Sequence, residues 1–353
     1  MSLVSEKLAR LRPYDPDTAA GGIRLDANES FVPLPESLRM EIGRRVSSLA
    51  FNRYPDPLGA AVCEAFGAYY GVDARFVTPG NGSDELITLL FNVLLGKGDR
   101  ALLVTPDFSM YRQYCALAEI EPVFLQKDHA LQFDVDELIA LARAKQVRMV
   151  LFSNPCNPTS QGIPAADVLK IVDALDCLVV VDEAYMDFWD EAVLHEAPTR
   201  KNCIVLKTLS KIGLAGIRLG FAVANDCLSA YLRAAKSPYN VNMLTQITGE
   251  AVLAEKKALQ NAVGRIRVSR DALYAALLPF APDGLRVFPA RANFVTLRTP
   301  AAAALHQALR SRGVSVRCIG GELLRITAGA PDENQVFIQA FTACVKEGTL
   351  ACG

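Results

Sequence analysis

Short runs of β-branched and aliphatic residues constrain the fold of this chain more than any other feature. Seven runs occur in which apolar residues follow one another instead of alternating with polar ones: 75–80, 101–106, 121–126, 147–155, 177–183, 203–208 and 219–224. This pattern is typical of strands that are buried on both faces of a parallel sheet. Segments with helical spacing, such as 82–95 and 133–146, separate the runs. The alternation predicts an α/β fold with a mostly parallel seven-stranded sheet, whose ligands bind beyond the carboxyl ends of the strands.

The pattern of the sequence changes after about residue 235. A long stretch with helical spacing (245–280) precedes short strand-like segments and two further helices, the last of them beginning near Asp332. This order predicts a smaller α+β domain at the C-terminal end. We therefore expect three parts: an N-terminal arm (1–30), a large ligand-binding domain (31–235) and a small domain (236–353).

Composition excludes several classes of function. The 37 basic and 38 acidic residues leave a formal charge of −1, and no basic arm stands out, so nucleic acid is not an expected partner. No apolar run has the length of a signal peptide core or a membrane span, so we expect no membrane partner. The nine cysteines are scattered without a CxxC pair and the three histidines lie far apart. These patterns favour free thiols in a reducing cytoplasm and predict no metal site.

Residues that could take part in catalysis follow two of the predicted strands. Asp182 and Tyr185 end one strand; after the next come Lys211, flanked by hydroxyl residues and glycines, and Arg218. Alone, the lysine would be read as a solvated charge and the aspartate as the cap of a turn. Together they form the set that pyridoxal phosphate requires: an amine that attacks an aldehyde and a carboxylate that keeps a pyridine nitrogen protonated. We therefore predict Lys211 as a Schiff-base lysine and Asp182 as the partner of the ring nitrogen.

The same cofactor needs a phosphate site and donors to its phenolic oxygen. The glycine-rich turn 80–85 opens a helix and offers backbone N–H groups and the positive end of a helix dipole. Thr208 and Ser210 offer hydroxyl groups, and Arg218 offers a bidentate clamp. Asn157 and Tyr185 could each donate to the phenolic oxygen, or serve only as a turn former and a packing residue.

Arg325 lies in the middle of an apolar strand of the predicted small domain. A half-buried arginine needs an anionic partner, either a structural carboxylate or the carboxylate of a substrate. A cleft between two domains favours the substrate.

The motifs, in their order, resemble those of the fold-type I aminotransferases, which depend on pyridoxal phosphate, and within them those of the histidinol-phosphate aminotransferase family. The resemblance runs nearly from end to end and rests on these segments: LRPYDP (11–16), LDANES (25–30), RYPDP (53–57), GNGSDELI (80–87), NPCNPT (154–159), VVVDEAYMDF (179–188), TLSK (208–211), GLAGIRLGF (213–221), RANFV (291–295) and LRITAG (324–329).

The resemblance assigns roles to individual residues. It implies catalysis by Lys211, Asp182 and Tyr185, and a substrate pocket that includes Arg325, Tyr14 and Asn28. It implies a homodimer in which Tyr54 reaches the cofactor phosphate of the neighbouring subunit. The cofactor would be surrounded by Gly82, Ser83, Asp84, Phe108, Asn157, Asp182, Tyr185, Thr208, Ser210, Lys211 and Arg218.

Four segments depart from the family pattern and predict a divergent member. KIGLAGIR (211–218) is one residue short, NPTSQG (157–162) replaces NPTG, Phe108 stands in place of the usual tyrosine, and the stretch 317–325 is shortened.

The function that the resemblance implies is the conversion of histidinol phosphate and 2-oxoglutarate into imidazole acetol phosphate and L-glutamate, or the transamination of a related aromatic amine. A decarboxylase acting on phosphothreonine is the alternative within enzymes. A regulator built on this fold would carry a DNA-binding helix-turn-helix, for which residues before 30 are too few and too weakly basic.

Overall fold

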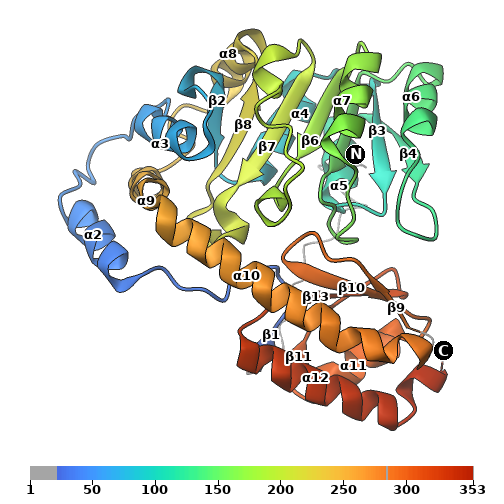
Figure 1. Cartoon of the computed structure of the whole chain (residues 1–353). Coiled ribbons are helices and arrows are strands. Elements are labelled where there is room, and N and C mark those ends of the chain that lie inside the picture. Colours follow the sequence, from blue (N-terminus) through green and yellow to red (C-terminus); the bar gives the residue numbers. More distant parts are fainter. Residues whose placement is uncertain (1–21, 284, 353) are drawn as a thin grey trace, which may run out of the picture.

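The computed structural model describes residues 22–283 and 285–352. Its largest element is a seven-stranded sheet with the order β2-β8-β7-β6-β5-β3-β4 (Figure 1). β8 runs antiparallel to both of its neighbours, whereas the pairs among β3 to β7 are parallel. The predicted α/β fold with a mostly parallel seven-stranded sheet is therefore confirmed. The strands are β2 (Val77–Gly80), β3 (Arg100–Thr105), β4 (Glu121–Gln126), β5 (Met149–Ser153), β6 (Leu178–Asp182), β7 (Cys203–Thr208) and β8 (Gly220–Ala224).

The central strands are buried on both faces, which explains their continuous apolar sequence. In β6, Val179 and Val181 belong to one hydrophobic cluster and Val180 to the other, because successive side chains of a strand point to opposite faces. Four helices between the strands and one after β8 cover these two faces (Figure 1). They are α4 (Ser83–Val93), α5 (Met110–Ala118), α6 (Val135–Ala144), α7 (Ala165–Ala174) and α8 (Asp226–Ala235).

Capping residues set where some of these helices begin. The Asp134 side chain accepts a hydrogen bond from the Glu137 N–H at 2.8 Å, at the start of α6. Asn225 accepts one from the Leu228 N–H at 3.0 Å, at the start of α8. Each cap satisfies a backbone donor that has no partner within the helix.

Three helices form a group on the β2 side of the sheet: α3 (Ala60–Tyr70) packs against β2, and α9 (Met243–Ala254) packs against both α3 and α2 (Glu36–Ser47) (Figure 1). α9 approaches its neighbours closely at Gly249, where a Cβ atom would lie 2.3 Å from Leu219 and 3.0 Å from Val62. The sequence predicted one helical stretch over 245–280. Instead a break at Glu255 (φ −89°, ψ 57°) separates α9 from α10 (Lys256–Leu277).

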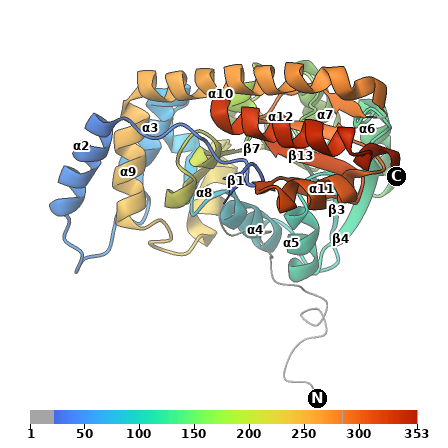
Figure 2. The same ribbon diagram turned by 90° about the horizontal axis from the view of Figure 1, so that it is seen from below.

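The C-terminal part contains a four-stranded antiparallel sheet with the order β12-β13-β10-β9. Its helices pack on one another, and α10 lies against α12 (Figure 2). Leu259 and Ile266 on α10 nevertheless belong to the hydrophobic cluster of the large sheet. The domain boundaries therefore remain a prediction. The elements are β9 (Arg286–Phe288), β10 (Phe294–Arg298), α11 (Ala302–Ser311), β11 (Val314–Ser315), β12 (Arg317–Ile319), β13 (Leu323–Thr327) and α12 (Pro331–Lys346).

The beginning of the described chain joins this C-terminal part. β1 (Ile23–Arg24) pairs in parallel with β11, and the Thr327 N–H donates to the carbonyl of Leu25 at 2.9 Å. These contacts place residues just after β1 near the carboxyl ends of the strands of the large sheet.

Candidate active site

A cavity of about 190 Å³ lies at the carboxyl ends of β5, β6 and β7. It brings together most of the residues that the sequence predicted for the site, from both the large sheet and the C-terminal part. The predicted residues that line it are Asn28, Ser83, Asp84, Phe108, Asn157, Asp182, Tyr185, Thr208, Ser210, Lys211, Arg218 and Arg325.

Lys211 ends a short 3-10 turn (Leu209–Lys211) that directly follows β7. Its Nζ atom lies 5.8 Å from the centre of the Tyr185 ring. The Tyr185 hydroxyl accepts a hydrogen bond from Asn28 Nδ2 at 2.9 Å, and the Asn28 N–H donates to Thr327 Oγ1 at 3.0 Å. The segment after β1 therefore orients a phenol beside the amine.

Asp182, the last residue of β6, is buried beneath the cavity. Its Oδ1 atom accepts the Ala184 N–H at 3.0 Å, and its Oδ2 atom accepts the Tyr111 hydroxyl at 2.8 Å. Burial raises the pKa of Asp182 to about 6, against the effect of these two hydrogen bonds. A cation placed beside this carboxylate would be strongly favoured, because it would compensate the desolvated charge.

The start of α4 forms a cradle for an anion. Gly82 has a φ of 81°, and a Cβ atom on it would lie 2.8 Å from a guanidinium nitrogen of Arg218. Gly220 passes so close that a Cβ atom there would lie 2.6 Å from the Ser83 nitrogen. The glycines thus leave room for backbone N–H groups at the positive end of a helix.

Arg218 faces this cradle from a left-handed backbone conformation (φ 55°). It pairs with Asp84 at 3.0 Å and donates to Ser210 Oγ at 3.4 Å. Ser210 Oγ lies 3.0 Å from Thr208 Oγ1. A guanidinium, two hydroxyl groups and a helix start therefore converge on one point, an arrangement that suits a phosphate group.

Arg325 extends from β13 toward the loop after β5. Its guanidinium donates to Asn157 Oδ1 at 2.6 Å and to the carbonyl oxygen of Asp26. This arginine, Asn28 and Ala27 supply the wall of the cavity that comes from β13 and from the segment after β1.

Sequence reasoning missed two groups of functional residues. The first is Tyr111, which is the partner of Asp182 and lies three residues after Phe108, at the start of α5. The second is Ser153 with Asp107: the Ser153 hydroxyl donates to Asp107 and accepts the Asn157 N–H at 3.2 Å. No local pattern in the sequence indicates the contact between Ser153 and Asp107.

Two of the predicted residues that the structure describes, Gly82 and Tyr54, do not line the cavity. Gly82 immediately precedes α4 and forms part of the cradle. Tyr54 is 79 % exposed and lies stacked on Tyr239 at the surface of the chain. Tyr14 lies outside the described residues.

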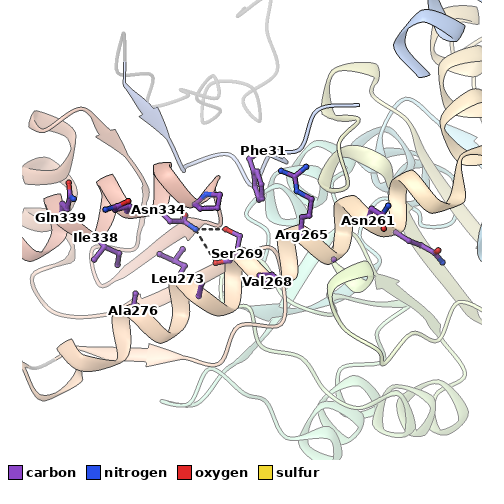
Figure 3. Close-up of a pocket in the computed structure, with 15 residues that line it drawn as sticks. Phe31, Asn261, Arg265, Val268, Ser269, Leu273, Ala276, Asn334, Ile338 and Gln339 are labelled. Carbon is purple, nitrogen blue, oxygen red and sulfur yellow. Dashed lines mark hydrogen bonds between the residues drawn. The ribbon is translucent and has the colours of Figure 1, made fainter. Parts of the chain in front are cut away.

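A wider groove of about 920 Å³ lies between α10 and α12 (Figure 3). Its lining is mostly apolar, with Val268, Leu273 and Ile338 among its residues, and Asn334 Nδ2 donates to Ser269 Oγ at 2.7 Å. None of the described residues predicted for the site lines this groove.

Residues 22–283 and 285–352 lack two further kinds of feature. No cluster of histidine, cysteine or acidic side chains there could hold a metal ion. In the same residues, no helix combines the length and the apolar character that crossing a membrane requires.

Comparison with known proteins agrees with this geometry. The model of the family "Aminotransferase class I and II" matches residues 20–341. The chain is 36 % identical to the histidinol-phosphate aminotransferase of Clostridium novyi (strain NT) over 349 residues, 98 % of this chain and 96 % of the relative. The chain therefore belongs to the class I and II aminotransferase family.

Solved structures share the fold. The histidinol-phosphate aminotransferase of Sinorhizobium meliloti, solved in complex with pyridoxal-5'-phosphate, superposes with a TM-score of 0.89 at 21 % identity, covering 98 % of each chain. The L-threonine-O-3-phosphate decarboxylase of Porphyromonas gingivalis superposes with a TM-score of 0.78 at 21 % identity, covering 92 % of this chain and 99 % of that one. At this identity the likeness establishes the fold and does not separate the two activities.

Proposed function

We propose that the protein is an aminotransferase that uses pyridoxal phosphate. The observation that carries this proposal is the convergence of Lys211, the buried Asp182 and the anion cradle on one cavity. The residues fit the cofactor: the space beside Gly82 suits its phosphate, and the carboxylate of Asp182 suits a protonated ring nitrogen. When bound, the cofactor supplies an aldehyde for the amine and an aromatic ring that withdraws electrons from the substrate carbon.

The residues of the chain divide the work between them. Arg218, Ser83, Thr208 and Ser210 would hold the phosphate, and Asp182 would hold the ring nitrogen. Lys211 Nζ is the group that takes a proton from the α-carbon of the substrate and later returns one.

Around the phenolic oxygen of the cofactor, Tyr185 and Asn157 are the candidate donors. The Asn157 Oδ1 atom accepts Arg325 at 2.6 Å, which leaves the Nδ2 group of this amide to donate. Asn28 Nδ2 donates to the Tyr185 hydroxyl at 2.9 Å and so leaves the phenol proton free to point at the cofactor.

For the substrates, we propose histidinol phosphate as the amine donor and 2-oxoglutarate as the acceptor, giving imidazole acetol phosphate and L-glutamate. The name of the Clostridium novyi relative supports this choice. The guanidinium of Arg325 suits the anionic end of either substrate, since it can bind a carboxylate or a phosphate through two parallel hydrogen bonds. A related aromatic amine is the nearest alternative donor.

We also propose a homodimer with shared active sites. Support comes from exposed apolar and aromatic side chains on α2 and on the loop before α3: Met40, Phe51, Tyr54 and Leu58 are each at least half exposed. Such clusters on one side of a soluble protein mark interfaces. Tyr54 belongs to this surface and would reach the cradle of the partner subunit.

A location in the cytoplasm completes the proposal. Among the cysteines whose side chains the structure describes, eight are free thiols, five of them buried. Unpaired thiols in this number suit a reducing compartment.

The test is a half-reaction followed by absorbance. The cofactor-loaded protein is mixed, without any oxo acid, with histidinol phosphate, phenylalanine, glutamate or phosphothreonine in separate cuvettes. We expect histidinol phosphate and glutamate to convert the bound cofactor to its amine form. Release of carbon dioxide from phosphothreonine, with the starting spectrum restored, would instead identify a decarboxylase.

A further inference from the structure

Tyr111 is a buried tyrosine at the cavity for which the proposed function provides no role. It lies on α5, is 1 % exposed, and donates its hydroxyl to Asp182 Oδ2 at 2.8 Å. Its ring meets the Phe108 ring edge to face, with centroids 5.4 Å apart. Burial and the nearby carboxylates of Asp182 and Asp107 raise the pKa of Tyr111 well above its usual value, so the phenol keeps its proton and acts as the donor.

We propose that Tyr111 is a positioning residue for Asp182: its hydrogen bond keeps this carboxylate ionised and oriented toward the ring nitrogen of the cofactor. The inference rests on the proposed use of pyridoxal phosphate. It adds a residue from α5 to a site whose other parts come from strand ends, the start of α4, β13 and the segment after β1.

The geometry supports the orienting part of this role. Ala184 N–H binds one oxygen of Asp182 from the chain just after β6, and Tyr111 binds the other oxygen from α5. Two donors on separate elements fix the rotation of the carboxylate plane. Each oxygen retains a second lone pair, so a ring N–H can still be accepted. A carboxylate held in this way is already in place when the cofactor arrives.

The charges around Asp182 explain why a donor is needed. The carboxylates of Asp107, after β3, and Asp84, on α4, oppose its ionisation, and burial opposes it further. The Tyr111 hydroxyl and the Ala184 N–H favour ionisation. Lys211 lines the same cavity from the β7 side. Loss of the Tyr111 hydroxyl would therefore raise the pKa of Asp182 further, toward neutral pH.

The experiment uses the cofactor-free protein and 4-deoxypyridoxine 5'-phosphate, an analogue without the aldehyde, which cannot bond to Lys211. Affinity is measured by fluorescence titration from about pH 5 to 8.5 in the natural protein and in Tyr111→Phe. Since binding a ring cation requires ionised Asp182, affinity in the natural protein should fall below about pH 6. In Tyr111→Phe the fall should begin about one pH unit higher, a loss of about tenfold in affinity within that window.

Tyr70→Phe is the matched control. The Tyr70 hydroxyl donates to Asp187 Oδ1 at 2.9 Å, so this variant also loses a tyrosine–carboxylate hydrogen bond, but Tyr70 does not line the cavity. Its pH curve should coincide with that of the natural protein. A second variant with 2,3-difluorotyrosine at position 111 retains the ring and strengthens the donor, and should move the fall to lower pH. If Tyr111→Phe does not fold, the fluorinated variant alone tests the role of Tyr111.

The outcomes separate the two proposals. Curves of Tyr111→Phe and the fluorinated variant that coincide with the natural one would overturn the role of Tyr111 and leave the proposed function intact. Failure of the natural protein to bind the analogue at any pH would overturn the proposed function, and the role of Tyr111 with it.

Discussion

The ring of Tyr54 lies stacked on the ring of Tyr239, with centroids 4.5 Å apart and planes inclined by 15°. Tyr239 has a φ of 61°, a conformation that is uncommon for residues other than glycine and asparagine. The loops that carry the two rings are joined, because Lys236 Nζ donates to the carbonyl of Pro57 at 2.6 Å. An aromatic side chain that is largely exposed is thus held in one direction, as a residue acting on a second subunit would need to be.

A shared active site can be tested with mixed dimers. Tyr54→Ala should weaken retention of the cofactor, and Lys211→Ala should abolish turnover. A dimer with one chain of each kind has one site that contains both natural residues, so it should recover part of the activity. Heterodimers confirmed by mass spectrometry that stay inactive would argue against a contribution of Tyr54 across the interface.

Lys211→Ala should reduce transamination by about 10³-fold or more, because the site loses both its amine and its proton carrier. The long-wavelength absorbance of the lysine-bound cofactor should also disappear. Lys201→Ala is the matched control, since Lys201 is an exposed lysine that pairs with Asp176 at 2.8 Å. Turnover by Lys211→Ala at the rate of the control would refute the assignment.

Arg325→Lys should raise the KM for 2-oxoglutarate by about 10-fold to 100-fold, with a smaller effect on kcat. The reason is that lysine retains the charge but cannot form two parallel hydrogen bonds with a carboxylate. Steady-state kinetics with varied 2-oxoglutarate measures the effect. Arg312→Lys, at an exposed arginine that pairs with Glu347, provides the comparison. An unchanged KM would mean that another group binds the carboxylate.

Glu183 should make stability depend on pH. It is fully buried, its Oε1 atom accepts the Val193 N–H at 2.6 Å, and burial raises its pKa to about 7. Between its ordinary pKa of 4.5 and this value, the folded chain holds a proton that the unfolded chain has lost. Stability is therefore lost as pH rises through this window and levels off above it.

Glu183→Gln removes that titration. The difference in free energy of unfolding between the variant and the natural protein should grow by on the order of 1–3 kcal/mol from pH 5 to pH 7 and stay constant to pH 8.5. Chemical denaturation of the cofactor-free proteins measures it. Asp182 titrates in both proteins and cancels from the difference. A difference that does not vary with pH would contradict the prediction.

Most of the fold could be predicted from local patterns in the sequence. Buried strands leave long apolar runs, and the helix beginning after Asp134 has its cap in the sequence. The break at Glu255 was not predicted, because the residues around it continue the helical spacing and no glycine or proline adjoins it. Before this break α9 packs against α3 around Gly249, and after it α10 packs against α12; the sequence alone indicates neither contact.

The residues of the site that follow strands could be predicted from local patterns, whereas the contacts between distant segments could not. Asp182 ends β6 and Lys211 follows β7 by three residues, so the carboxyl ends of two neighbouring strands bring them together. The contacts of Tyr111 with Asp182 and of Asn28 with Tyr185 join segments that no local rule relates. Such pairings depend on how whole elements pack, and only the three-dimensional structure reveals them.

The hydrogen bond between Asn28 and Thr327 joins residues 299 positions apart in the chain. Chains are made from the N-terminus at about 5–20 residues per second, and domains fold as units during synthesis. The last strand of the large sheet ends at Ala224, so the cradle and the lysine can assemble while the chain is still on the ribosome. The wall formed by Asn28 and Arg325 must wait for β13. During synthesis, Lys211 and the residues of the cradle are therefore made well before Arg325, the last residue of the chain that lines the cavity.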